Sequence, residues 1–297
     1  MAPSVVAIVL CGALLHAGWN ALVKKGRDPF LSSVLVASGA GLISLPLLPF
    51  LTQPAAASWP YALLSTIIHY FYYGLLSAAY RHGDMSHAYP LMRGSAPLLV
   101  ALSSVPLLGE HLTVTQYAAV ACISGGIFGL WYATRSPAPL SASPAADDAS
   151  VREASAARRR STIYALLNAL VIAAYTLVDG MGARASGAPA AYVMWLHVLS
   201  AIGLLAWCLV LCPRQLRDYA CEFWRVALLG GAGTLGAYGL ALWAMTVAPL
   251  AAVAALRETS ILFAALIARF FLSERIGRKR AFAIAAIAAG AVLMRLA

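Results

Sequence analysis

Long apolar stretches of this 297-residue sequence contain Arg93, Arg257 and Glu258 well inside them, and Asp179 stands at the end of another. A charge surrounded by hydrocarbon is costly unless it is paired or used. Such residues therefore mark a binding site, a coupling site or an internal ion pair. If both arginines faced one cavity, their forked donors would suit a carboxylate, phosphate or phosphonate. Arg93 and Arg257 are thus the first candidates for ligand binding.

The alternative is that the protein itself neutralises both arginines. Residues adjacent on a helix point about 100° apart, so Glu258 does not face Arg257. A pair between Glu258 and Arg93 would leave Arg257 for a substrate, whereas a closed structural network would leave neither. Glu258 is also the first candidate for a proton-coupling carboxylate. Asp179 is the second, although its place near the end of an apolar stretch favours a solvated or capping role.

Histidine, asparagine and aromatic side chains in these stretches form a second group of candidates. His16, Trp19 and Asn20 occupy positions i, i+3 and i+4 and share one helix face. That face either lines a cavity or forms hydrogen bonds with a neighbouring helix. Small-molecule pockets are commonly lined by aromatic rings with a few polar groups. The rings that suit such a lining are His69, Tyr73, Tyr89 and Tyr238.

Ten apolar stretches must position these residues. The chain is 62% hydrophobic and 11% charged, whereas soluble domains have about half and a quarter. At about 1.5 Å per residue, a helix made from each stretch can cross most or all of a hydrocarbon core about 30 Å thick. None alternates as the strands of a membrane barrel do. The predicted helices are 5–23, 32–51, 61–79, 88–108, 114–133, 163–178, 192–211, 226–245, 250–271 and 281–296.

The second half of the sequence repeats the first at an offset of 164 residues. The matched pairs are Arg93 with Arg257, Glu110 with Glu274, and Gly126 with Gly290. Five helices per copy is an odd number, so the second copy enters the membrane from the other side, as in the inverted repeats of secondary transporters. We predict an all-α integral membrane fold of two inverted five-helix repeats, 1–135 and 162–297. The segment 136–161, rich in Ala, Ser and Pro and ending in arginines, is predicted to be a flexible basic linker.

Helix interiors and ends give two further expectations. Pro90 and Pro97 remove backbone hydrogen bonds within the predicted helix 88–108 and favour a kinked or mobile helix there. Glu110 and Glu274 lie in the loops that follow two of the predicted helices, and we expect them to cap or brace the hairpin to the next helix rather than bind a substrate.

The basic residues indicate which loops share one side of the membrane. Sixteen of the 21 Lys and Arg residues lie in the loops after the first, third, fifth, seventh and ninth predicted helices, and two, Arg184 and Arg295, lie on the opposite side. Basic loops are retained in the cytoplasm. This rule places loop 136–161 inside and both termini outside. The net charge of +10 therefore encodes topology and does not indicate nucleic-acid binding.

Three groups of residues resemble the drug/metabolite transporter superfamily, specifically its EamA-type ten-helix proteins. They are His16-Ala17-Gly18-Trp19-Asn20, the run 89–94 leading to Gly109-Glu110, and the run 257–260 leading to Ser273-Glu274-Arg275. The resemblance implies a central cavity lined mainly by helices 1–4 and 6–9. It also implies transport of amino acids, organic anions, sugars, nucleotide-linked sugars or drugs, often as export and sometimes with proton coupling. It implies both termini in the cytoplasm, against the charge distribution.

We therefore predict a secondary-active transporter, an exporter of an amino acid or organic anion by alternating access, in a bacterial-type inner (plasma) membrane. Its partners would be a small-molecule substrate and membrane lipid, with coupling protons and a homodimer left open. No nucleotide-binding loop of the Walker type occurs, and no metal-ligand spacing or cofactor motif is present. The alternatives are a flippase or an enzyme acting on a lipid-linked substrate, and a passive structural subunit.

Overall fold

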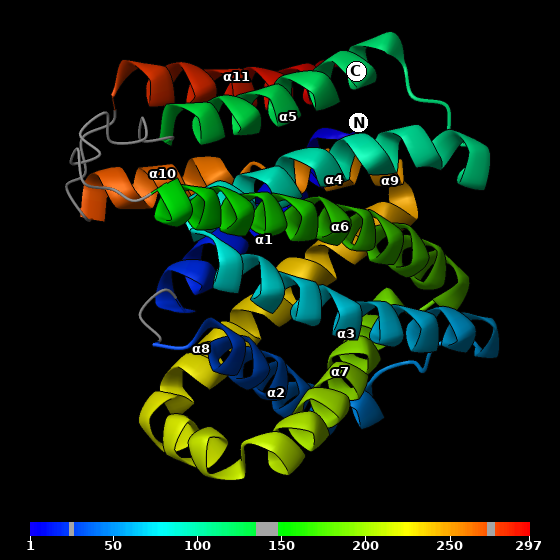
Figure 1. The fold of residues 1–297 in the computed structure, drawn as a ribbon. Coiled ribbons are helices and arrows are strands. Elements are labelled where there is room, and N and C mark those ends of the chain that lie inside the picture. The colour runs from blue at the N-terminus through cyan, green and yellow to red at the C-terminus, as the bar shows by residue number, and fades with distance from the viewer. Residues whose placement is uncertain (24–26, 135–147, 272–276) are drawn as a thin grey trace.

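The computed structural model describes residues 1–23, 27–134, 148–271 and 277–297. Within these residues the chain is helical and has no strand (Figure 1). Two short 3₁₀ helices, Leu48–Phe50 and Ala56–Ser58, lie between the second and third α-helices. The α-helices are α1 (Pro3–Val23), α2 (Pro29–Leu47), α3 (Trp59–His82), α4 (Met85–Leu108), α5 (Val114–Thr134), α6 (Asp148–Ser186), α7 (Pro189–Leu211), α8 (Pro213–Val247), α9 (Leu250–Arg257), α10 (Ser260–Phe271) and α11 (Arg278–Leu296).

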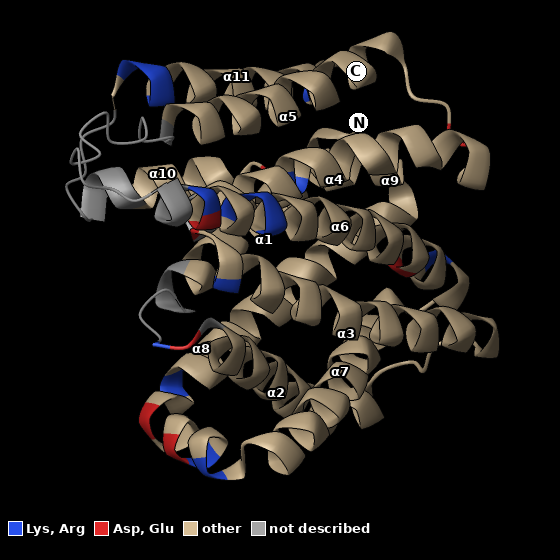
Figure 2. Cartoon of the chain, viewed as in Figure 1, with Lys and Arg blue, Asp and Glu red and all other residues tan. Residues whose placement is uncertain are grey.

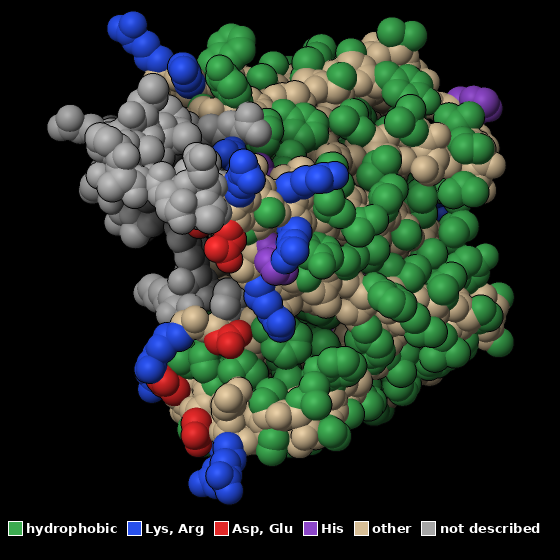
Figure 3. All heavy atoms as spheres, in the orientation of Figure 1, with side chains coloured by type: hydrophobic (Ala, Val, Ile, Leu, Met, Phe, Trp, Pro, Cys, Tyr) green, Lys and Arg blue, Asp and Glu red, His purple; other side chains and the backbone are tan. Residues whose placement is uncertain are grey.

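The helices are those of a membrane protein. In the part of the chain that the structure describes, nine helical segments are long and apolar enough to cross a membrane, with α9 and most of α10 forming one of them. The remaining long helix, α11, begins with three basic residues and packs along α5. Hydrophobic side chains cover most of the face seen in Figure 3. Lys and Arg gather at one end of the bundle, where α6, α8 and α11 begin (Figure 2). We call this end the basic end.

The contact between α5 and α11 shows the two-fold relation between the repeats. The two helices lie side by side (Figure 1). A Cβ atom added at Gly126 would lie 2.6 Å from Ile287, and one added at Gly290 would lie 2.6 Å from Ile123. Both glycines and both isoleucines are 164 residues apart. The same close approach is therefore made twice, once from each repeat, and the predicted inverted repeat is confirmed.

The predicted helix 250–271 is not continuous. It is divided into α9 and α10 at Glu258 and Thr259. The N–H groups of Glu258, Thr259 and Ile261 donate to carbonyls three residues earlier, at 3.0–3.1 Å. An α-helix bonds four residues back, so the backbone tightens locally in the manner of a 3₁₀ turn. By contrast α4, with Pro90, Pro97 and Pro106 inside it, remains one helix.

The predicted flexible linker is partly wrong. α6 begins at Asp148 and runs for 39 residues, so the last part of segment 136–161 is helical. Arg152, Arg158, Arg159 and Arg160 lie on this helix and not in a loop. The physical reason is composition, because Ala, Glu and Arg, which dominate 152–160, are among the strongest helix formers. Residues 136–147 lie outside the described part of the chain, as do Lys24 and Lys25 of the first basic loop and Glu274.

Candidate functional site

A cavity of about 160 Å³ lies between the two repeats. Nine of the predicted site residues line it: His16, Trp19, Asn20, His69, Tyr73, Tyr89, Arg93, Tyr238 and Arg257. The other two, Glu258 and Asp179, are not in the lining, but each is bonded to a residue that is. The structure thus brings together groups from α1, α3, α4, α6, α8 and α9. Their role in binding a substrate stays a prediction.

Several lining residues were missed by the sequence analysis. Tyr175 of α6 is the most central of them, because His69 stacks on its ring at a centroid distance of 4.4 Å. Its position four residues before Asp179, on the same helix face, is the signal that could have identified it. The other polar lining residues outside the predicted set are Ser33, Tyr72, His197, Ser200 and Thr234, of which Tyr72 and His197 belong to the aromatic rings that the sequence places within the helices.

Arg93 is held by Glu258 across the interface between the repeats. The Arg93 Nε donates to Glu258 Oε2 at 2.8 Å, and both side chains are buried. The break between α9 and α10 turns the carboxylate toward α4, as one of the two sequence hypotheses required. Arg93 still contributes to the cavity wall, but its charge is compensated.

Arg257 has a different environment. Its guanidinium carbon lies 5.1 Å from the centre of the Tyr238 ring, which is the geometry of a cation–π contact. Among the described residues no carboxylate forms an ion pair with it. Arg257 therefore lines the cavity as a cation, and its N–H groups donate to none of the described residues.

Asp179 is not the solvated or capping residue that we expected. Its side chain has no exposed surface, and its Oδ2 accepts a hydrogen bond from the Tyr238 hydroxyl. The expectation failed because α6 does not end with its apolar run but continues to Ser186. Asp179 therefore lies a full two turns inside the helix.

Two histidines flank Tyr238. His69 and His197 lie 6.4 Å and 6.1 Å from it between ring centroids. The Nδ1 of each lies 2.9 Å from the carbonyl four residues earlier in its own helix. In a neutral imidazole this makes Nδ1 the donor and leaves Nε2 as an acceptor. The site is thus built of a half-buried arginine, Arg257, and a buried carboxyl group, Asp179, joined by a phenol and edged by two imidazoles.

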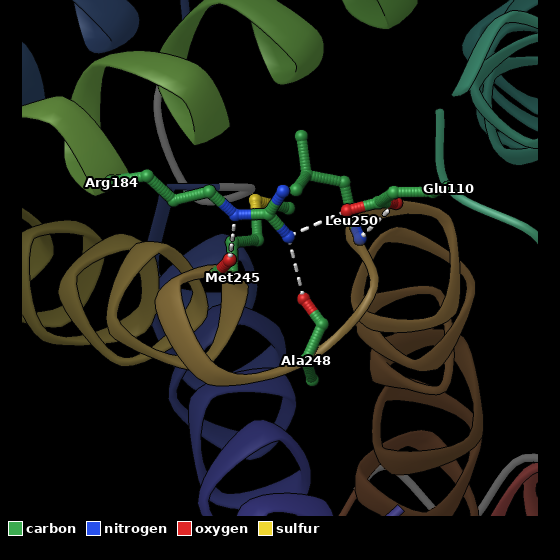
Figure 4. A network of polar contacts seen from close by, with 5 residues as sticks. All are labelled: Glu110, Arg184, Met245, Ala248 and Leu250. Carbon is green, nitrogen blue, oxygen red and sulfur yellow. Dashed lines mark hydrogen bonds and ion pairs between the residues drawn. The ribbon is translucent and has the colours of Figure 1, made fainter. Parts of the chain in front are cut away.

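A second polar cluster lies away from the cavity (Figure 4). Glu110, after α4, binds Arg184 at 2.6 Å and accepts a hydrogen bond from the Leu250 N–H at 2.9 Å. Arg184 also donates to the carbonyls of Met245 at 2.7 Å and Ala248 at 2.9 Å. We call these residues the Glu110 cluster.

The Glu110 cluster corrects an expectation. Glu110 does not brace the hairpin between α4 and α5. It reaches into the other repeat, where its negative charge caps the N-terminus of α9. One carboxylate thereby ties the end of α4 to α6, α8 and α9.

The cavity and the Glu110 cluster occupy opposite halves of the bundle. The cavity lining uses the end of α1 and the beginning of α4, which belong to the basic end. In the other half the largest hydrophobic cluster is packed around α9, whose residues Leu250–Leu256 are all buried. The Glu110 cluster lies at the outer edge of this packed half.

Comparison with known proteins identifies the family. The family model for EamA-like transporters matches residues 3–132 and 159–296, which together make up most of the chain. The chain belongs to the EamA-like transporter family. This membership confirms the resemblance seen in the sequence.

The fold of this EamA-like transporter is also found among solved structures. One crystal structure superposes with a TM-score of 0.73 at 19% identity, covering 99% of this chain and 96% of the other. At that identity the likeness establishes the fold alone. A search of curated proteins gave no significant match. Its family and its apolar helices make the chain a multi-pass membrane transporter of small molecules.

Proposed function

We propose that this EamA-like transporter is a secondary-active exporter of a small metabolite with a negative group, an amino acid or an organic acid. The observation that carries the proposal is Arg257. It lines a cavity inside the membrane, on the face of Tyr238, and no described carboxylate neutralises it directly. A guanidinium in such a place can bind a carboxylate through two charge-assisted hydrogen bonds.

The lining of the cavity supports a small polar solute over a lipid-linked one. The lining combines phenols, imidazoles, hydroxyls and an arginine. The alternative, a flippase or an enzyme acting on a lipid-linked substrate, calls for a cavity that admits a long chain.

The asymmetry between the two halves of the bundle supports alternating access. The half toward the basic end contains the cavity, and the half beyond it is filled by α9 and closed at its edge by the Glu110 cluster. We place the basic end in the cytoplasm because of its lysines and arginines, in a bacterial-type inner membrane. The structure then corresponds to the state in which the cavity faces the cytoplasm. Export is inferred from the resemblance to family members.

The proposal is tested with purified protein in liposomes and a panel of labelled amino acids, organic acids and neutral sugars. We expect saturable transport of at least one amino acid or organic acid, above the level of protein-free liposomes. Transport restricted to neutral sugars, or transfer of a fluorescent lipid between leaflets with no solute transport, would overturn the proposal. Applying each solute from inside and from outside the vesicles measures the preferred direction.

A further inference from the structure

Asp179 lies at the centre of a buried polar group that joins several helices. Its Oδ2 accepts a hydrogen bond from the Tyr238 hydroxyl, and the Arg257 guanidinium lies over the face of the same ring. Its Oδ1 is buried and has no hydrogen-bond partner among the residues described. An ionised carboxylate with one bare oxygen in a buried place bears a desolvation cost that a bound proton would remove.

The neighbours of Asp179 leave it without direct charge compensation. No Lys, Arg or His in the described residues forms an ion pair with it. On α4, Arg93 is already paired with Glu258. The titratable or polar groups that face this region from the surrounding helices are Ser65 and His69 on α3, Tyr175 on α6, Tyr192 and His197 on α7, Tyr238 on α8 and Arg257 on α9.

We propose that Asp179 is the residue that binds a proton during transport. Glu258, the first candidate from the sequence, is held by the Arg93 guanidinium at 2.8 Å, so its negative charge is already compensated. Asp179 accepts a hydrogen bond from the neutral Tyr238 phenol, forms no ion pair among the described residues, and keeps Oδ1 for the proton. The proton binds at Oδ1, and the Tyr238 hydroxyl stays on Oδ2.

The charge of Asp179 bears on the binding of an anion at Arg257. The two residues contact the hydroxyl and the face of one ring, so an ionised Asp179 repels an anion that approaches Arg257. A proton on Asp179 removes this repulsion. By linkage the anion and the proton each favour binding of the other. They would cross together, so export in this scheme is driven by an outward gradient of the solute that is large enough to carry the proton with it. This link to transport rests on the proposed function.

Three helices, α6, α8 and α9, connect Asp179 to the packed half of the bundle. Each of them contains one residue near Asp179 and one residue of the Glu110 cluster. The pairs are Asp179 and Arg184 on α6, Tyr238 and Met245 on α8, and Arg257 and Leu250 on α9. A change of charge at Asp179 therefore acts on the three helices that the Glu110 cluster holds together. Through these helices, proton binding at Asp179 would act on the Glu110 cluster, which closes the packed half of the bundle at its edge.

Infrared difference spectra between acidic and alkaline pH test the proton site on the full-length protein in lipid. We expect a carbonyl band from a protonated carboxyl that disappears in Asp179→Asn. The matched control is Asp218→Asn, which removes an exposed aspartate on α8 and should keep the band. In Tyr238→Phe the band should remain but move to higher frequency, because the carbonyl loses its hydrogen-bond donor.

Persistence of the band in Asp179→Asn would overturn the proposal, as would its absence from the wild type or an unmoved frequency in Tyr238→Phe. Loss of the band in Glu258→Gln with retention in Asp179→Asn would assign the proton to Glu258 instead. Size-exclusion profiles check that each variant is folded. The spectra need no substrate, so failure of the transport panel would sink the proposed function and leave the proton site standing.

Discussion

Arg93 in the first repeat and Arg257 in the second are matched by the same offset of 164 residues, and both line the central cavity. Arg93 is bonded to Glu258, whereas Arg257 rests on an aromatic ring. A symmetric scaffold therefore carries an asymmetric distribution of charge. The comparison teaches that one arginine can join the repeats through an ion pair while its counterpart forms no ion pair among the described residues.

The two repeats differ at the residue that follows each arginine, and this residue determines whether a carboxylate is available to form an ion pair. In the first repeat this residue is Gly94, and a Cβ atom there would lie 3.2 Å from Phe128 and 3.3 Å from Ile127. The packing of α4 on α5 is thus tight at Gly94, and a side chain there would have to displace Phe128 or Ile127 by a few tenths of an ångström. In the second repeat the residue is Glu258, at the break between α9 and α10, and its side chain reaches Arg93.

The backbone is loosened at the same level in both repeats, but by different means. Pro97 has no N–H, so the Arg93 carbonyl lacks its ordinary donor four residues later. The corresponding residue in the second repeat is Ile261. Its N–H donates to the Glu258 carbonyl at 3.1 Å instead of the Arg257 carbonyl, which would be its acceptor in a regular α-helix. Irregular backbone at this depth is tolerated where it lies against protein or a polar cavity.

Removing the first arginine should have the largest effect. Arg93→Met leaves Glu258 buried without its partner, which should destabilise the protein by about 3–5 kcal/mol. Unfolding of the purified protein in detergent by chemical denaturant measures the loss.

The double variant Arg93→Met with Glu258→Gln is the control for this prediction, because it removes both charges and should recover most of the stability. If Arg93→Met instead kept its stability and lost transport, Arg93 would be a ligand of the substrate. The two arginines would then not differ as the comparison states.

Removing the second arginine should act on transport more than on stability. Arg257→Ala deletes a charge-assisted contact worth about 1.5–3 kcal/mol, which corresponds to a loss of about tenfold to 150-fold in the kcat/KM of transport. Its stability should change little, because no described ion pair is broken. Arg257→Lys keeps the charge but loses the planar fork, so its transport should be intermediate. Unchanged transport in Arg257→Ala would show that this arginine is structural.

The sequence was sufficient to predict the repeats and nine of the residues that line the cavity, because membrane spans require long apolar runs and polar or ionisable residues within them stand out. The break after Arg257 could not be predicted. The span contains no interior Pro or Gly, and the side chain at the break, Glu258, bonds to Arg93 in another helix. A local pattern carries no information about such a partner.

Asp179 and Glu110 show the same limit. The hydrogen bond from Tyr238 to Asp179 joins residues 59 apart in sequence, and that from Leu250 to Glu110 joins residues 140 apart. Each residue lies near the end of an apolar run, where solvation or local capping is the ordinary outcome. Only the packing of α6 and α9 against the other repeat gives them buried or cross-repeat partners.

The smallest predicted effect concerns the far end of the helix that carries Arg257. Glu110→Gln removes the charge that binds Arg184 and caps α9, while keeping the shape of the side chain. The Arg184 side chain is 35% exposed, so the pair should contribute at most about 1 kcal/mol. That energy shifts the balance between closed and open states by up to about fivefold. The first repeat's arginine, held by Glu258, should be unaffected.

The measurement uses a cysteine at Val253, which is fully buried on α9, in a protein whose five native cysteines have been replaced. A membrane-impermeant thiol reagent should label it up to about fivefold faster in Glu110→Gln than in the parent. The matched control is Glu222→Gln, which breaks the exposed pair with Arg27 at the basic end and should leave labelling unchanged. Equal labelling in all three proteins would show that the Glu110 cluster does not contribute to the closure of the packed half. Arg257 would then differ from Arg93 only in its local contacts, with no connection through α9 to the far end.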